Sequence, residues 1–458
     1  MSLRPLVFNV QAAGLPAYLR PGGTTVAPWQ WMPVASQTNE QMGTVAPTPR
    51  PASTLSSTGH PFTGWDAWTG AVVDQSRKEM IFPARGGHGD SADNSTYATN
   101  LAHDAPKIYR LTSPSTEAAF QASRNRPQPT APNPDLYTDG FSPAMHHCNE
   151  LQYQDGRIWW IAQTSTSGEG TTATSTSGFN GNWIIPACIS LDRDAMGSGP
   201  IAVGDSRYPL SNAASNLWRK HGRTSQFWVN QLGGFGCSAA MPTAHKVFGF
   251  KEFTGQNEFI TINTTPGATE TTRATYGAAG VPLGVSAWAV GCDDLGIVVV
   301  GRYGTATINV LAGVTASTAG TWHSVSVPNS YLWNEYDPTS AGTFRDGYNP
   351  VYHAASRSIF LYEFNQNTSG KIRRLKIPTS GGAYQQGGTW QWSEIQTANF
   401  VTQQMGQQVG GQNTYGRFNI INDIGGGNAV LVHSPRTNAS VAGPALPIYV
   451  CRIDGSLT

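Results

Sequence analysis

The chain has 458 residues, of which only 12% are charged, and its formal net charge is +1. Binding to nucleic acid depends on clustered Lys and Arg, so this weakly charged sequence excludes a nucleic-acid partner. No window approaches the roughly 18 apolar residues that a membrane-spanning helix needs, which excludes insertion into a membrane. The 5 cysteines show no CxxC pair, which argues against a disulfide framework or a zinc knuckle.

The N-terminal region, residues 1–35, is predicted to be an arm that contains one strand. Its first residues hold a short apolar run broken by Asn9 and Gln11, which makes a poor signal peptide. The motif WQWMPV at 29–34 indicates an isolated strand. Residues 36–60 are rich in Pro, Ser and Thr and are expected to be a linker. Residues 61–458 are then expected to form one body of repeated units.

One pattern recurs six times after the linker: a strand, a tight polar turn and a strongly apolar second strand. Helical periodicity is almost absent, and the apolar runs are rich in Val, Ile, Tyr, Phe and Trp, which is typical of β-structure. The six hairpins are expected at residues 68–84, 148–162, 237–250, 287–301, 349–363 and 417–433. Their unequal spacing is what loop insertions into a repeat would produce.

Further strands follow most of the hairpins and are often marked by Trp or Tyr. They are expected at residues 107–112, 257–264, 320–327, 388–395 and 446–454, with a weaker candidate at 206–210. Four-stranded units repeated around an axis describe an all-β propeller, which hides its sheet edges by radial repetition. We predict a β-propeller with six blades, with seven blades as the alternative.

The sixth unit lacks one strand, because the chain ends soon after the strand predicted at 446–454. The motif at 29–34 resembles WQWSEI at 390–395, which is a late strand of the fifth unit. We therefore predict that residues 29–34 supply the outer strand of the last blade and close the ring. Closure leaves no terminal blade free to fray. The alternative is that this strand packs elsewhere.

The first unit carries the most specific motif of the chain. Its hairpin ends in Gly86-Gly87, and Tyr97 and Tyr109 follow. This pattern resembles the kelch repeat, and residues 65–112 look like the first blade of the kelch-like propellers predicted in many bacteriophage genomes. The later units keep the hairpin and lose the glycine pair. The resemblance implies a virion component of the tail tip or tail fibres, assembled in the host cytoplasm in multiple copies with other virion proteins.

The stretch ARGGHGDSADNSTY at 84–97 allows three interpretations, of which a polar turn is favoured. A phosphate-binding loop would need a helix after the glycines, whereas a strand follows. A metal site on His88, Asp90 and Asp93 would need ligands held on rigid elements. We therefore expect no metal and no cofactor. His88 and Asp90 of this loop are kept as candidates for contact with a ligand. The candidate ligand-binding residues are His88, Asp90, His146, Arg223 and Tyr348.

Signatures of propeller enzymes are missing from the sequence. The nearest match to the Asp box of sialidases, TASTAGTW at 315–322, lacks the aspartate, and no Cys has the context of a galactose-oxidase crosslink. A glycosidase needs two carboxylates at a defined separation. The candidates for that role are Asp139, Asp293, Asp346 and Glu363, which the sequence alone cannot bring together.

These observations predict a non-enzymatic protein without catalytic residues that recognises a host-surface polysaccharide. The low charge and the abundance of Ser, Thr, Asn and Gln suit contact with a glycan, as do Trp and Tyr in long loops. Two alternatives stay open. One is a glycan-active hydrolase or epimerase on the same fold, and the other is a purely architectural module of the capsid, neck or tail.

Overall fold

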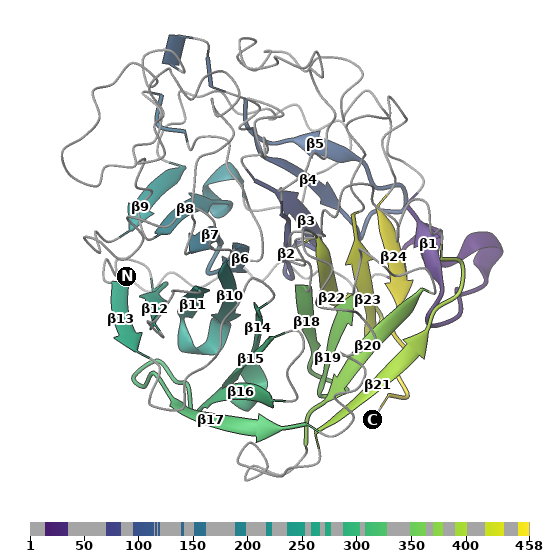
Figure 1. Ribbon diagram of the computed structural model, residues 1–458. Helices are drawn as coiled ribbons and strands as arrows, with labels where there is room; N and C mark the ends of the chain where they lie inside the picture. The colour runs from purple at the N-terminus through teal and green to yellow at the C-terminus, as the bar shows by residue number, and fades with distance from the viewer. Residues whose placement is uncertain are drawn as a thin grey trace, which may run out of the picture.

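The computed structural model shows six antiparallel sheets of four strands among the residues it describes, and these sheets stand around a common axis (Figure 1). The described residues are 14–34, 70–83, 95–113, 115–116, 118–119, 139–141, 151–161, 188–197, 217–221, 236–251, 258–265, 271–275, 287–302, 307–327, 349–362, 370–378, 390–400, 417–434 and 448–457. The prediction of an all-β propeller is therefore confirmed, with six blades and not seven.

Each blade takes its strands from one stretch of chain, except the last. Blade 1 contains β2 (Val72–Asp74), β3 (Glu79–Phe82), β4 (Tyr97–Asn100) and β5 (Ile108–Arg110). Blade 2 contains β6 (Leu151–Gln154), β7 (Arg157–Ile161), β8 (Cys188–Asp192) and β9 (Trp218–His221). Blade 3 contains β10 (Gly236–Met241), β11 (Lys246–Lys251), β12 (Glu258–Asn263) and β13 (Thr271–Thr275).

The second half of the ring repeats this order. Blade 4 contains β14 (Ala287–Cys292), β15 (Ile297–Arg302), β16 (Thr307–Ala312) and β17 (Thr321–Ser326). Blade 5 contains β18 (Asn349–His353), β19 (Ser358–Tyr362), β20 (Lys371–Lys376) and β21 (Gln391–Gln396). Blade 6 contains β22 (Phe418–Gly425), β23 (Asn428–His433), β24 (Tyr449–Arg452) and, from the N-terminal arm, β1 (Trp31–Pro33).

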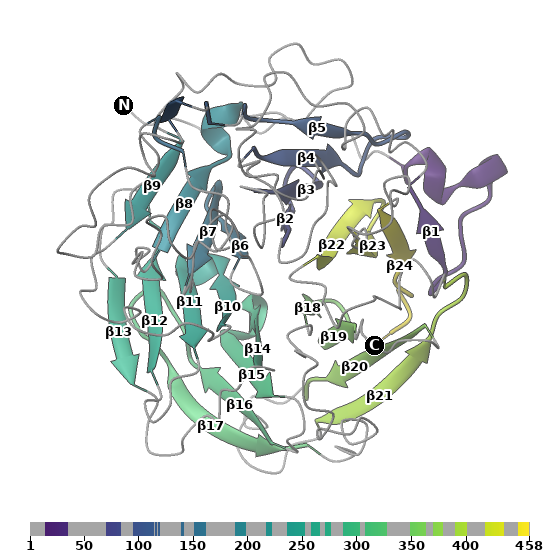
Figure 2. The ribbon, with the colours of Figure 1, turned by 45° about the horizontal axis from the view of Figure 1, so that its top comes forward.

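The first strand of every blade lies nearest the axis and the fourth strand lies at the outside (Figure 2). All six predicted hairpins are present as the first two strands. The second strands are apolar because successive side chains point to opposite faces of a sheet, and both faces of each blade pack against a neighbour. In β19 every side chain from Ser358 to Tyr362 is buried. Among the described residues, no helix is long and apolar enough to cross a membrane.

The N-terminal strand closes the ring, as the sequence predicts. β1 pairs with β24 in antiparallel register, with Trp31 opposite Cys451 and Pro33 opposite Tyr449. The arm also reaches the neighbouring fifth blade, because the backbone N–H of Trp31 donates to the carbonyl of Ala398 at 3.0 Å. Blade 6 therefore contains both the first and the last described strands of the chain.

The segment before β1 extends the closure to blade 1. It carries two short 3-10 turns, η1 (Ala17–Leu19) and η2 (Pro21–Gly23). The Tyr18 hydroxyl donates to the carbonyl of Leu101 at 2.6 Å, and the backbone N–H of Ala17 donates to the Asp104 carboxylate at 2.6 Å. Leu19 is buried in the same apolar cluster as Leu101. Residues 14–34 thus contact blades 5, 6 and 1. We call this arm the N-terminal clasp, because it holds the last two blades of the ring to the first.

A buried ion pair joins blades 1 and 2. The Arg193 guanidinium donates to both oxygens of Glu79, at 3.0 and 3.1 Å, and both side chains are fully buried. Beside it, Arg77 contacts Asp74 of its own blade and Asp194 of blade 2, each at 2.6 Å. Burial opposes ionisation of Asp74, but hydrogen bonds from Ser76 and Arg77 prevail and lower its pKa. These charges tie the first two blades together.

A buried histidine beside the closing strand predicts a pH dependence of stability. Burial lowers the pKa of His433 well below its ordinary value of 6.5, and the charge of Arg417 acts in the same direction. The unfolded chain then binds a proton near pH 6.5 that the folded chain does not bind. The free energy of unfolding should therefore fall as the pH drops below 6.5, by up to about 1.4 kcal/mol per pH unit from this group.

Urea unfolding of the native chain and of His433→Asn at pH 7.5, 6.5 and 5.5 checks this expectation. Most other titrating groups contribute equally to both proteins, so the difference between their free energies of unfolding isolates His433. The free energy of unfolding of the native chain minus that of His433→Asn should become smaller from pH 6.5 to pH 5.5, because only the native chain loses stability through His433. A constant difference would contradict the assignment.

Candidate functional site

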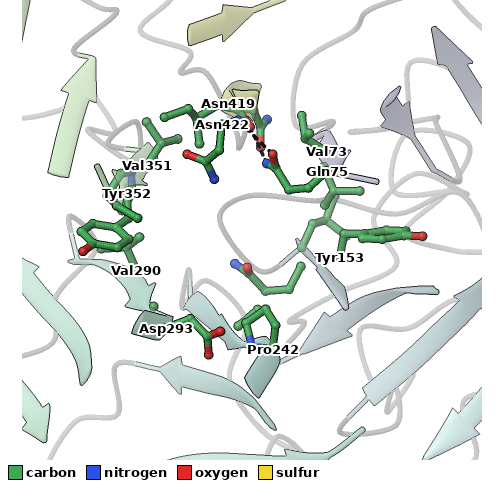
Figure 3. Close-up of a pocket in the computed structure, with 18 of the residues that line it drawn as sticks. Val73, Gln75, Tyr153, Pro242, Val290, Asp293, Val351, Tyr352, Asn419 and Asn422 are labelled. Atoms are coloured by element: carbon green, nitrogen blue, oxygen red, sulfur yellow. Dashed lines mark hydrogen bonds between the residues drawn. The ribbon is translucent and has the colours of Figure 1, made fainter. Parts of the chain in front are cut away.

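A cavity of about 420 Å³ lies on the axis of the ring. Its walls come from the first strands of all six blades and from the turns that follow them (Figure 3). Apolar wall positions include Val73, Val290 and Val351. Gly291 lets β14 approach β10, because a Cβ atom there would lie 1.9 Å from the carbonyl oxygen of Ala240. The cavity is therefore a product of the ring as a whole and not of one blade.

Carboxamides line the side of the cavity where the ring closes. Gln75 of blade 1 donates to the carbonyl of Ile420 at 2.7 Å and accepts from the backbone N–H of Asn422 at 3.0 Å, both in blade 6. Asn419 donates from its amide to the carbonyl of Ala71 at 3.3 Å. The Asn422 side chain is exposed, and it points toward the cavity in Figure 3. The side chains of Gln75 and Asn419 thus hydrogen-bond blade 6 to blade 1. The amide of the Asn422 side chain is left facing the cavity.

Two carboxylates stand on the turn after β14, η7 (Asp293–Leu295). Asp293 accepts hydrogen bonds from the backbone N–H of Thr243 at 2.9 Å and from its hydroxyl at 2.6 Å. Asp294 accepts one from the hydroxyl of Tyr352 at 3.3 Å. Figure 3 shows Asp293 across the cavity from Asn422. The site therefore offers hydrogen-bond acceptors on one side and a carboxamide on the other.

Tyr153 and Tyr352 line opposite sides of the cavity, and both their rings and their hydroxyls point away from it (Figure 3). The Tyr153 hydroxyl accepts from Arg77 at 3.0 Å, while that of Tyr352 bonds to Asp294. Burial, followed by nearby negative groups, raises the pKa of both phenols. Both phenols are therefore neutral at ordinary pH and bring no charge to the cavity.

The walls suit binding of an uncharged polar molecule better than catalysis by paired carboxylates. Hydrolysis of a glycoside needs two carboxyl groups on opposite sides of the bond. Among the described residues that line the cavity, the carboxylates are Asp293 and Asp294, which are neighbours on one turn. Apolar walls with a few convergent polar groups are typical of small-molecule sites. The described residues contain no group of three or more His, Cys, Asp or Glu that could hold a metal ion.

The five candidate ligand-binding residues from the sequence all lie outside the described residues. In the chain, His88 and Asp90 fall between β3 and β4, His146 precedes β6, Arg223 follows β9 and Tyr348 precedes β18. Their role as ligand contacts stays a prediction.

The structure also places two of the carboxylates considered for a glycosidase. Asp293 lines the cavity, whereas Asp139 does not, and its carboxylate accepts from the backbone N–H of Phe141 at 3.2 Å. The other two, Asp346 and Glu363, lie outside the described residues.

Sequence reasoning missed most of the cavity residues. Gln75 lies just after the end of β2, and Asn422 follows Ile421, the last residue of β22 before its register shift; like Asp293 after β14, both read as ordinary turn residues. Their shared position in the repeat is a signal that could have found them. In a propeller the same position of every unit faces the same axis, so polar residues there converge.

Comparisons with known proteins give no assignment. No protein-family model matches the chain, and no curated protein matches it. Solved structures with a similar arrangement include the phage phi92 endosialidase, at 10% identity and a TM-score of 0.40, covering 85% of this chain and 67% of that one. A luciferin-regenerating enzyme aligns at 7% identity and a TM-score of 0.39, covering 85% and 92%.

The apo form of AztD from Citrobacter koseri aligns at 10% identity and a TM-score of 0.35, covering 84% of this chain and 90% of that one. All three identities are very low and all three scores lie below 0.5. The similarities therefore carry no inference about function.

Proposed function

We propose that this protein is a non-enzymatic component of a bacteriophage virion, located at the tail tip or in a tail fibre, and that it recognises a host-surface glycan. The observation that carries the proposal is the axial cavity, in which the Asn422 amide and the Asp293 carboxylate lie on opposite sides of a space lined by valines. Hydroxyl groups of a sugar can donate to Asp293 and bond with Asn422, while the C–H surface of the sugar packs on the valine side chains of the wall. A cavity of about 420 Å³ has room for one or two sugar units.

The virion assignment rests on the resemblance of residues 65–112 to kelch-like blades of phage proteins and on the low-charge composition. The glycine pair that carries the kelch-like character, Gly86-Gly87, lies outside the described residues. Cryo-EM of the phage particle that contains this chain is expected to place several copies at the tail tip or fibre, next to other virion proteins. Copies confined to the capsid or neck would favour the architectural alternative.

Replacing Asn422 with alanine tests the cavity as the glycan site. The substitution removes a hydrogen-bonding group from an exposed side chain and should leave the fold intact. We expect binding to weaken about five- to tenfold, because a net hydrogen bond contributes about 1 kcal/mol. The measurement is biosensor titration of the purified full chain against a panel of bacterial surface polysaccharides.

The matched control is Gln391→Ala, which removes an exposed carboxamide from the outer strand β21. It should bind like the native protein. Equal binding by all three proteins would mean that the glycan binds outside the cavity. New reducing ends or altered sugars after incubation with the same polysaccharides would favour the glycan-active enzyme instead.

A further inference from the structure

The described lining of the axial cavity carries charge of one sign. It includes Asp293 and Asp294, and no Lys or Arg is among the described residues that form it. The Arg77 guanidinium contacts Tyr153 from behind the wall, but it is paired with Asp74 and Asp194. A molecule that enters the cavity therefore meets the Asp293 carboxylate and no Lys or Arg among the described wall residues, while the charge of Arg357 acts on Tyr352 behind the wall.

The Asp293 carboxylate is held in place by its neighbour in blade 3. The backbone N–H and the hydroxyl of Thr243 both donate to it, and the N–H lies within hydrogen-bond distance of both oxygens, at 2.9 and 3.1 Å. A carboxylate fixed in this way cannot swing aside to relieve repulsion from an anionic ligand. It keeps lone pairs that can accept from a hydroxyl or an ammonium group.

The second carboxylate has a similar constraint. Asp294 accepts from the hydroxyl of Tyr352, which belongs to blade 5. The two acidic side chains of one turn are thus tied to the blades on either side of it. Their positions are set by the ring, and a ligand does not have to order them before binding.

Resting on the proposed function, we propose that the cavity selects uncharged and amino-bearing sugar units and excludes acidic sugars such as uronic and sialic acids. Proteins normally bind a carboxylate through the bidentate guanidinium of an Arg or through a Lys, and the described walls contain neither residue. An acidic sugar would lose its hydration beside the like charge of Asp293, with Asp294 next to it in the chain. A neutral or amino sugar would instead donate hydrogen bonds to Asp293.

Matched methyl glycosides provide the test. For the gluco, galacto and manno series, the methyl hexoside, the methyl 2-amino-2-deoxyhexoside and the methyl hexuronide share one ring and differ in charge. Titration calorimetry with the full chain at about 20 mM salt should show the best neutral or amino sugar binding at least tenfold more tightly than the uronide of its series. Added salt should narrow the gap, because it screens the repulsion.

Removing the two charges should remove the discrimination. In the double variant Asp293→Asn and Asp294→Asn, the gap between the neutral sugar and the uronide should fall at least threefold. The control variant Asp454→Asn changes a partly exposed aspartate that is not among the residues lining the cavity, and it should keep the native gap.

The possible results separate this inference from the function on which it rests. Uronides that bind as tightly as neutral sugars, with binding weakened by Asn422→Ala, would overturn the charge selection and leave glycan recognition standing. An unchanged gap in the double variant would also overturn it. Failure of every sugar to bind at millimolar concentration would contradict the proposed function and this inference together.

Discussion

Replacing Trp31 with alanine is expected to lower the free energy of unfolding by about 3–5 kcal/mol, the range for truncating a fully buried tryptophan. Trp31 is the anchor of the closing strand. Its indole N–H donates to the Thr397 hydroxyl of blade 5 at 3.1 Å, and its ring meets that of Tyr362 edge-on at 5.9 Å between centroids. Loss of the ring removes contacts to blades 5 and 6 together. Urea denaturation measures the change.

A second buried tryptophan separates ring closure from loss of core volume. Trp288 in β14 is also fully buried, but it lies in blade 4. Trp288→Ala should destabilise the protein by a similar amount. Hydrogen exchange should then differ: Trp31→Ala should increase exchange chiefly in β24 and β4, on the two sides of the closure. An equal increase around the whole ring would show that β1 adds stability without acting as a clasp.

Replacing Glu79 with alanine is expected to cost about 3–5 kcal/mol, because it leaves the Arg193 guanidinium buried without its carboxylate. The double variant Glu79→Leu with Arg193→Met should recover much of this loss, since apolar residues of similar size do not require burial of a charge. Urea denaturation of the native chain, of Glu79→Leu, of Arg193→Met and of the double variant gives the coupling free energy between the two side chains. Strict additivity of the two single effects would contradict a direct pairing.

An exposed ion pair in the same protein provides the control. Lys371 and Glu394 lie 2.7 Å apart on neighbouring strands of blade 5, with side chains 43% and 23% exposed. Glu394→Ala should change stability by no more than about 1 kcal/mol, because water and salt screen the pair. The contrast between the two carboxylates tests burial as the cause of the large effect.

Much of the fold could be predicted from the sequence because a blade is a local structure. Each hairpin joins strands that are neighbours in the chain, so alternating apolar residues and polar turns mark it directly. Even the long-range pairing of β1 with β24 left a local trace, since the last unit lacked a strand and residues 29–34 offered one. The notable gap was the N-terminal clasp on blade 1, because nothing near Tyr18 signals its contact with Leu101.

The candidate site had to come from the tertiary structure. Gln75 and Asn422 are 347 positions apart, and Glu79 and Arg193 are 114 apart. A shared position in the repeat can suggest that a residue faces the axis, but it does not say which residues of different blades touch. The sequence by itself determined the all-β class and the six hairpins, and it pointed to the strand that closes the ring, because hydrophobic alternation and turn chemistry act over a few residues. Only the closed ring decided which turn residues meet at the axis, because their approach depends on how six packed sheets are angled around it.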